Sequence, residues 1–579
     1  MAGSSFNSLS PVDYVVMALM LLILTGMGIY HGMAKRRPTT TRSFFLADRS
    51  IFSLPIALTI LASFISPITL LGYAAETYFF GGHYLLIGLQ TIPSTLVISE
   101  ILIPVFYGLE ITTAYQYFYL RYGFPMRLLG ALCFLLQTLF YVAIVSYTPA
   151  LVVNAVTNLN LWIVIVTTGL VCTFYTTMGG IKAVIWTDVF LAIVMSGTSI
   201  LVIVSCLIEA GGFGKVWEIN RQDGRFEVFN FPVDPTTRTT FLSVVIGTFW
   251  STLSIYGISQ TAVQRFLSAR SVKDAKWSMW LNVPFSTIVI GAATLQGVVL
   301  YAFYHTKTDV VSPTMYCDED CTSPLEQPVT YVNQPPNFTS PDQIVMIFVN
   351  QQFSHIPGYQ GIFISCIFAG ALSTISSGIN SMVAVTIEDI WKPLRKWLKD
   401  HHQIQLQDND ARDTKISKIL SVLFGLLSIG LAFLASRLGT LVTIINSVLG
   451  IFGAPILGAF LVGMLWRRAV PRAVFCGTLL SISIGVWIIA GSYAQAGKPD
   501  AFYAYRISFF WYGTITVLTT MIVSVLLGEI LKLVNMAGIE KAVDPSLLCW
   551  FLRPSEPPVM TTSIKTISAE VKKIETSEL

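Results

Sequence analysis

Charged side chains are scarce in this chain of 579 residues: they make up 12% of it, whereas hydrophobic residues make up 54%. A soluble globular domain carries about a quarter charged residues, so this composition excludes an ordinary soluble protein. The formal net charge of +4 is small and is spread over several connections, which gives no reason to expect a nucleic-acid partner. Histidine is rare, with six residues, and none of them has a convincing partner for a transition-metal site.

Catalytic signatures are missing as well. The chain has no HExxH pair, no GxxxxGK[ST] phosphate loop and no GxSxG elbow, so the residues give no basis for an enzyme and imply no cofactor. Of the eight cysteines, six lie in apolar runs or near the C-terminus and are expected to act as small packing residues. Only Cys317 and Cys321 lie close together in a polar segment, where they could pair in an oxidising compartment.

Long apolar runs occupy most of the chain. A helix needs about 20 apolar residues to cross a bilayer, so these runs predict an all-α polytopic membrane protein. On that rule we expect about thirteen transmembrane helices, with approximate limits 12–30, 51–74, 83–107, 125–148, 161–179, 186–210, 240–262, 277–304, 361–391, 415–437, 440–466, 471–492 and 508–533.

Basic residues lie mainly in alternate connections between these runs. They occur in the connections at 35–49, 265–276, 392–412 and 467–472, which the positive-inside rule assigns to the cytosol. This pattern predicts that the N-terminus lies outside the cell and the C-terminus inside. The segment 211–239 is an exception, since it carries Lys215, Arg221, Arg225 and Arg238.

The connection 305–360 favours the same sidedness. It contains a sequon at Asn337, an acceptor for a glycan only on the luminal or outer face, together with Cys317 and Cys321. We therefore expect a multi-pass glycoprotein of the plasma membrane. The last three residues, Ser577 to Leu579, fit the short pattern that PDZ domains bind by strand addition, which makes a PDZ protein an expected partner.

A polar interruption lies in the middle of the apolar segment 54–81. Proline lacks a backbone N–H and clashes with the preceding turn, so Pro67 is expected to break the helix beside Ser66. Freed backbone groups at membrane depth are tolerated only where protein or a cavity satisfies them, and a broken helix with hydroxyl side chains is therefore a candidate ion and substrate site. The alternative is a kinked helix whose Ser and Thr side chains bond their own backbone.

The seventh span carries a second interruption, a hydroxyl-rich stretch at 251–260 that includes Gly257. Spans two to six and spans seven to eleven form two sets of five, and each interruption falls in the first span of its set, as expected of an inverted-repeat transporter. The resulting division is a first helix and loop at 1–50, repeats at 51–210 and 211–466, two further helices at 467–533 and a cytosolic tail at 534–579.

The ninth span is unusually polar, with five hydroxyl or amide side chains between Gly370 and Asn380. Sodium is a hard cation that prefers oxygen ligands, and the adjacent Ser373 and Thr374 could both bind one ion. The alternative is that these hydroxyls stabilise helix packing, as is common in membrane bundles. In the sixth span, Asp188 is a gating candidate because carboxylates within membrane helices are often functional; its alternative role is an N-terminal helix cap.

Four stretches, at 62–72, 173–190, 255–270 and 371–390, together resemble the sodium/solute symporter family, most of all its sodium-coupled monocarboxylate, multivitamin and iodide transporters. The resemblance implies a five-plus-five inverted-repeat fold like that of the leucine transporter. It also implies sodium-driven uptake of small organic monoanions such as short-chain monocarboxylates. Vitamins of the biotin or pantothenate kind and iodide-type anions are alternative substrates. An alternative of another class is a solute sensor or sodium-permeable channel on the same fold.

The resemblance also implies roles for individual residues. The sodium site would use backbone carbonyls of Ala62, Ile65 and Gly370 and the hydroxyls of Ser373 and Thr374. A second sodium or the substrate would involve a further group, namely Ser66, Thr69, Tyr141, Ser376 and Ser377. The side chains expected to shape the substrate pocket are Phe64, Thr69, Thr252, Ser254 and Tyr256.

Overall fold

The structure, a computed structural model, is built from helices. It describes residues 9–33, 49–157, 159–178, 181–226, 231, 233–307, 340–402, 410–435, 438–496, 498, 500–534 and 543–553. Among these residues the one extended pairing is an isolated parallel bridge between Ile51 and Ala269. The predicted all-α class is therefore confirmed.

Within the described residues the predicted apolar runs are mostly helical, apart from interruptions such as 65–66 and 258–259. Within the described residues, eight helical segments are long and apolar enough to span a membrane, and two bent pairs raise this number to ten. Two shorter apolar helices, Pro11–Met20 and Leu161–Thr173, fall in the first and fifth predicted runs. The seventh run differs from the prediction because its break leaves pieces too short to span: η4 (Ser243–Gly247), α12 (Thr248–Gly257) and α13 (Gln260–Phe266).

The two sets of five spans can be followed along the chain. The first set contains α3 (Ser53–Phe64) with α4 (Pro67–Phe80), then η2 (Gly82–Gly88), α5 (Thr91–Val97), η3 (Ile98–Leu102) and α6 (Ile103–Gly108), then α8 (Phe124–Thr157), α9 (Leu161–Met178) and α10 (Ile181–Glu209). The second contains η4, α12 and α13, then α14 (Val272–Lys307), α16 (Tyr359–Val385) with η6 (Thr386–Trp391), α18 (Asp410–Ala435), and α19 (Leu441–Val448) with η7 (Leu449–Gly453) and α20 (Ala454–Leu465).

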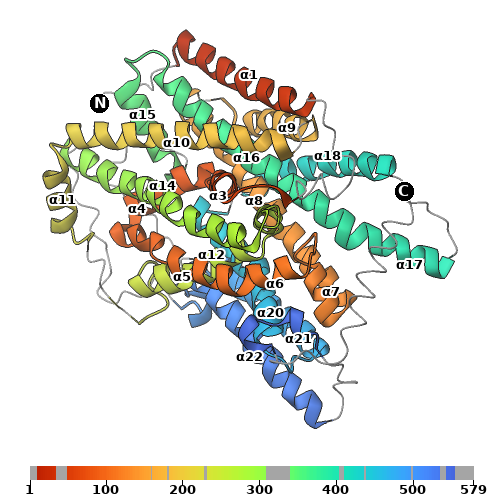
Figure 1. Ribbon diagram of the computed structural model, residues 1–579. Coiled ribbons are helices and arrows are strands. Elements are labelled where there is room, and N and C mark those ends of the chain that lie inside the picture. The colour runs from red at the N-terminus through yellow and green to blue at the C-terminus, as the bar shows by residue number, and fades with distance from the viewer. Residues whose placement is uncertain are drawn as a thin grey trace.

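Further helices surround these sets. They are α1 (Pro11–Met33), α7 (Gln116–Tyr122), α11 (Phe213–Gln222), α15 (Ile344–Phe353), α17 (Lys392–His402), α21 (Pro471–Ala494) and α22 (Tyr512–Leu533). In Figure 1, α1 lies along one edge of the molecule and α21 with α22 lie at the opposite end, while α3, α4, α8 and α12 occupy the middle.

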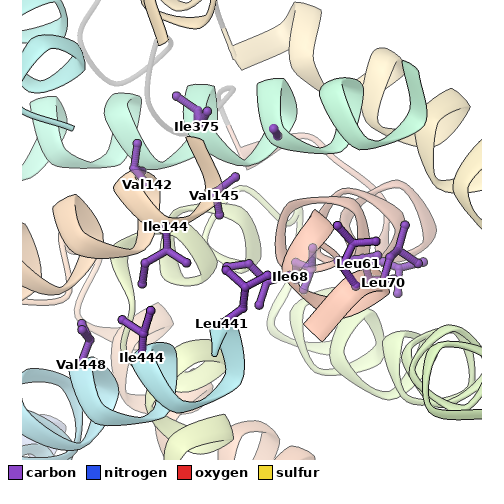
Figure 2. Close-up of a cluster of buried hydrophobic side chains, with 14 of the residues drawn as sticks. Leu61, Ile68, Leu70, Val142, Ile144, Val145, Ile375, Leu441, Ile444 and Val448 are labelled. Atoms are coloured by element: carbon purple, nitrogen blue, oxygen red, sulfur yellow. The ribbon is translucent and has the colours of Figure 1, made fainter. Parts of the chain in front are cut away.

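Apolar side chains from both sets form the core around the first broken helix. Figure 2 shows Leu61 and Ile68, from α3 and α4, near Leu441 of α19, with Val145 of α8 and Ile375 of α16 on another side. All five side chains are buried. α14 packs along α3 and α4, and α16 packs along α8 and α10, so the broken helix is enclosed by long, unbroken ones.

Helix α1 is attached to the central helix α16 by a capping contact. The Asp13 carboxylate accepts hydrogen bonds from the backbone N–H groups of Gly358 and Gly361 at 3.0 and 2.9 Å. These are donors that the first turn of α16 cannot satisfy within the helix. A Cβ atom at position 361 would lie 2.5 Å from the Asp13 carbonyl oxygen, so glycine permits the close approach of α1 to α16.

Two arginines of the segment 211–239 are bound inside the protein. Arg225 donates to the carbonyls of Thr77 and Tyr78, at 2.7 and 2.6 Å, and so satisfies the C-terminal end of α4. Arg238 pairs with Glu76 of α4 through two contacts, at 2.9 and 3.0 Å. These guanidinium groups are internal partners of α4 rather than free loop charges, which explains why this segment departs from the charge pattern of the other connections.

Candidate functional site

The first break lies where the sequence predicts it. α3 ends at Phe64, α4 begins at Pro67, and the two axes differ by 59°. Pro67 is the first residue of α4, a position where its missing N–H has no helical partner to lose. Ser66, just before it, has an extended backbone with φ −96° and ψ 168°.

The break releases carbonyl oxygens that a continuous helix would use. The Ser66 N–H donates to the Phe64 carbonyl at 3.0 Å instead of to the Ala62 carbonyl four residues back. Likewise, the Thr69 N–H donates to the Ser66 carbonyl at 2.9 Å rather than to that of Ile65. The C-terminal end of α3 therefore presents oxygens and the negative end of its dipole at the break.

Helix α16 lies directly against this break. A Cβ on Gly370 would be 3.3 Å from Cδ of Pro67. Thr374 is buried, and its hydroxyl has no hydrogen-bond partner among the described residues. Ser373 is also buried. The structure thus brings together the five residues predicted from sequence as a sodium site, Ala62, Ile65, Gly370, Ser373 and Thr374, on two elements in contact.

A cavity of about 110 Å³ opens beside the break. Six of the predicted pocket or second-site residues line it, namely Phe64, Ser66, Thr69, Tyr141, Thr252 and Tyr256. The rings of Phe64 and Tyr256 are 4.6 Å apart between centroids, so they form one aromatic wall. Every residue that the structure places around this cavity is uncharged.

Three of the residues predicted for the pocket or the second site do not line this cavity. Ser254 lines a smaller cavity of about 10 Å³ next to it. Ser376 donates to the Ser373 carbonyl of its own helix at 3.1 Å, and Ser377 accepts a hydrogen bond from Arg265 at 3.0 Å.

Other predicted positions lie beyond what the structure describes. Asp188 belongs to α10, but its side chain is outside the description. Asn337, Cys317 and Cys321 fall between residues 308 and 339, and Ser577 to Leu579 fall after residue 553. The glycan, the disulfide, the PDZ contact and the gating role remain predictions.

Sequence reasoning missed several polar residues of the cavity. Gln90 and Thr91, at the start of α5, and Gln137 and Thr138, in α8, all line it. The available signal was an amide inside an otherwise apolar run, as at Gln137 between Leu136 and Thr138. These residues lie outside the interrupted spans from which the pocket was predicted.

Arg265 also lies closer to the site than its assignment to a cytosolic connection suggests. It is in α13 and donates to the hydroxyls of Thr59, in α3, and Ser377, in α16, at 3.1 and 3.0 Å. The Ser377 hydroxyl is in turn 3.5 Å from that of Ser63, which lines the cavity. Arg265 therefore links three helices at one end of the cavity.

A family model described as the sodium:solute symporter family matches residues 44–485. The chain belongs to this family. It is 35% identical to a sodium-dependent multivitamin transporter of Oryctolagus cuniculus over 84% of this chain and 71% of that one. It is also 35% identical to sodium-coupled monocarboxylate transporter 1 of Homo sapiens, over 84% of this chain and 75% of the relative.

A solved structure of a Na⁺-coupled sialic acid symporter shares the fold. The TM-score is 0.73 at 23% identity, covering 90% of this chain and 98% of that one. The predicted family and the polytopic all-helical fold are confirmed. The protein is a sodium-coupled solute symporter of the membrane and not an enzyme.

Proposed function

We propose that this symporter imports small organic monoanions, with short-chain monocarboxylates as its substrates, across the plasma membrane by alternating access. The observation that carries the proposal is the cavity at the first break, which is small, about 110 Å³, and lined by uncharged side chains. Pockets for drug-sized ligands usually measure about 300–1,000 Å³, so this size favours a substrate of few atoms.

The lining suits a molecule with one polar and one apolar end. Hydroxyls of Thr69 and Thr252 and the amide of Gln137 can donate hydrogen bonds to a carboxylate, while Ile68 and Ile290 offer apolar contacts. The N-terminal end of α4 begins at the cavity with Ser66 and Pro67, and its partial positive charge favours an anion. A bound sodium ion would supply the remaining positive charge.

That sodium ion is proposed to lie between the first break and α16. The released carbonyls of Ala62 and Ile65, the carbonyl of Gly370 and the hydroxyls of Ser373 and Thr374 would form a neutral oxygen cage. The buried Thr374 hydroxyl supports this assignment, because it has no partner among the described residues and an unmet buried hydroxyl costs free energy.

A vitamin is the second candidate substrate, because the multivitamin relative is as similar to this chain as the monocarboxylate relative, at 35% identity each. Uptake of labelled acetate, propionate, butyrate, lactate, biotin, pantothenate and iodide, each in sodium and in choline medium, separates the candidates. We expect saturable, sodium-dependent uptake of the short monocarboxylates and little of biotin or pantothenate. The reverse order would assign the protein to vitamin transport, and sodium current without uptake of any solute would favour a channel.

A further inference from the structure

A small cavity of about 10 Å³ lies at the second break, next to the large cavity. Gln137 and Ser259 line both cavities, so the two are neighbours. We call the small one the α12 niche; it is lined by Tyr115, Phe134, Gln137, Ser254, Ile258, Ser259, Phe452, Gly453 and Ile456. About 10–15 Å³ holds a single water-sized particle, so the α12 niche fits one ion or one water and no organic solute.

Two side-chain oxygens meet in the α12 niche. A Cβ placed on Gly453 would lie 2.5 Å from the Ser254 hydroxyl oxygen and 2.6 Å from the Gln137 amide oxygen. The two oxygens therefore lie on the same side of Gly453 and no more than 5.1 Å apart, and one hard cation with oxygen contacts of about 2.3–2.6 Å could bridge them. Glycine at position 453 is what leaves this space open.

The Ser254 hydroxyl lacks a partner. Ser254 is 1% exposed, and its oxygen makes no hydrogen bond within the described part of the chain. The Gln137 amide oxygen lies beside it, on a side chain that is half-buried. A buried hydroxyl left unsatisfied in a membrane protein interior needs an explanation, because it costs free energy unless something binds it.

The backbone at the second break adds negative potential. The Ile258 and Ser259 N–H groups both donate to the Ser254 carbonyl, at 3.3 and 3.2 Å. The Ile255 carbonyl thereby loses the donor that a continuous helix would give it. The C-terminal end of the ten-residue helix α12 therefore borders the α12 niche with the negative end of its dipole, which favours a cation over a neutral molecule.

The two breaks correspond in their surroundings. At the first, the C-terminal end of α3 faces Thr374 of α16, the third span of the other set; at the second, the C-terminal end of α12 faces Gln137 of α8, again the third span of the other set. We propose that the α12 niche binds a second sodium ion, held by Ser254, Gln137 and the end of α12. Its charge would lie beside the uncharged cavity and help to hold the anion there. This last point, and the count of this ion as the second, rest on the proposed function.

Binding of radioactive sodium to the purified full-length transporter tests the site without any substrate. We expect two sodium ions per wild-type protein and one in Ser254→Ala, with Ser254→Thr keeping both because it keeps the hydroxyl. Gly453→Ala, whose methyl group would occupy the α12 niche, should also bind one. Ser251→Ala, one turn earlier in α12, is the matched control and should bind two. Retention of two sodium ions by both Ser254→Ala and Gly453→Ala would overturn the proposal and leave a water site.

Transport measurements provide a second reading. With two sodium ions and one monoanion, each cycle moves one positive charge, so uptake should carry inward current with a Hill coefficient for sodium near two. Ser254→Ala should lower the Hill coefficient for sodium to about one and abolish the net charge moved with each anion. Loss of one bound sodium in Ser254→Ala, combined with no uptake of any monocarboxylate, would retain the sodium site and reject the substrate. Sodium-dependent uptake of a monocarboxylate, combined with two sodium ions still bound to Ser254→Ala, would instead retain the substrate and reject the α12 niche as a sodium site.

Discussion

The half-helices that follow the two breaks, α4 and α13, are each attached to a connecting segment, 211–239 for α4 and 109–115 for α13, but by different chemistry. The α4 clamp is the ion pair of Glu76 with Arg238, whose side chains are 1% and 15% exposed. The Arg238 guanidinium also lies 3.8 Å from the centre of the Phe80 ring. The α13 clamp is neutral: the Gln260 amide accepts from the Ala114 N–H and donates to the Thr112 carbonyl, both at 3.0 Å.

This difference implies unequal costs of opening. Separating a buried ion pair leaves two charges in a medium that solvates them poorly, whereas the amide and backbone groups of the α13 clamp can exchange their bonds for bonds to water at small net cost. We therefore expect the end of the molecule at the α13 clamp to open more readily than the end at the α4 clamp.

The largest effect should come from Arg238→Met, which leaves Glu76 buried without its counter-charge. Loss of one partner of a buried pair costs about 3–5 kcal/mol, so the midpoint of thermal unfolding should fall markedly in detergent solution. The double variant Glu76→Gln with Arg238→Met removes both charges and should recover most of this loss. A single variant as stable as the wild type would show that the α4 clamp contributes little.

The next effect concerns sodium at the first break. Thr374→Ala removes the unpartnered hydroxyl, and we expect the sodium concentration for half-maximal uptake to rise about tenfold, equivalent to about 1.4 kcal/mol. Thr386→Ala is the matched control, since that hydroxyl bonds the Met382 carbonyl of its own chain segment at 2.8 Å. An unchanged sodium dependence in Thr374→Ala would move the ion elsewhere.

The α13 clamp should give a smaller change in stability than the α4 clamp. Gln260→Leu leaves the Ala114 N–H and the Thr112 carbonyl unpaired, which costs about 1–3 kcal/mol if they stay buried and less if water reaches them. Thermal unfolding of this variant beside Arg238→Met measures the difference directly. An equal loss of thermal stability in the two variants would contradict the expectation that the α4 clamp costs more to open than the α13 clamp.

The smallest effect is a pH dependence near the α4 clamp. Asp342, in η5 (Pro341–Gln343), is 1% exposed. Its pKa is raised from 3.8 to about 7, chiefly by burial and to a smaller extent by Glu76, although hydrogen bonds from the Leu441 N–H and the Ser340 hydroxyl and the charge of Arg238 lower it. Because the folded state binds this proton more tightly than the unfolded chain, stability should fall as pH rises from about 4 to 7. Asp342→Asn should flatten that part of the profile of unfolding temperature against pH; an identical slope in the variant would contradict the assignment.

Local chemistry made the first break and much of the cavity predictable. Pro67 and its neighbouring hydroxyls marked the break, and Thr252 and Tyr256, four residues apart, share one helix face, which lines the cavity as expected. Ser254 lies between them in sequence and therefore points about 200° away around the helix, into the α12 niche. The predicted pocket included Ser254 because it belongs to the hydroxyl-rich stretch 251–260, although residues of this stretch lie on different faces of the helix.

The rest depends on contacts between distant parts of the chain. Glu76 and Arg238 are 162 residues apart, and no pattern in a single sequence pairs them. Gln90 and Gln137 lie in spans without a break, so their orientation toward the cavity follows from how α5 packs on α12 and α14 and how α8 packs on α4 and α16. Arg265 was assigned to a connection because it precedes further basic residues, although α13 carries it back among the helices.

The cap that Asp13 provides for α16 also bears on how the protein is made. Asp13 precedes Gly358 by 345 positions, so at a synthesis rate of roughly 5–20 residues per second the ribosome needs about 17 to 70 s to supply the partner. During that interval the Asp13 carboxylate has its local donors, the Ser10 N–H and hydroxyl at 2.9 and 2.7 Å, but not those of α16. The N–H groups at the start of α16 reach the Asp13 carboxylate only when α16 packs against α1. We therefore expect the packing of α1 against α16 to be a late step in biogenesis.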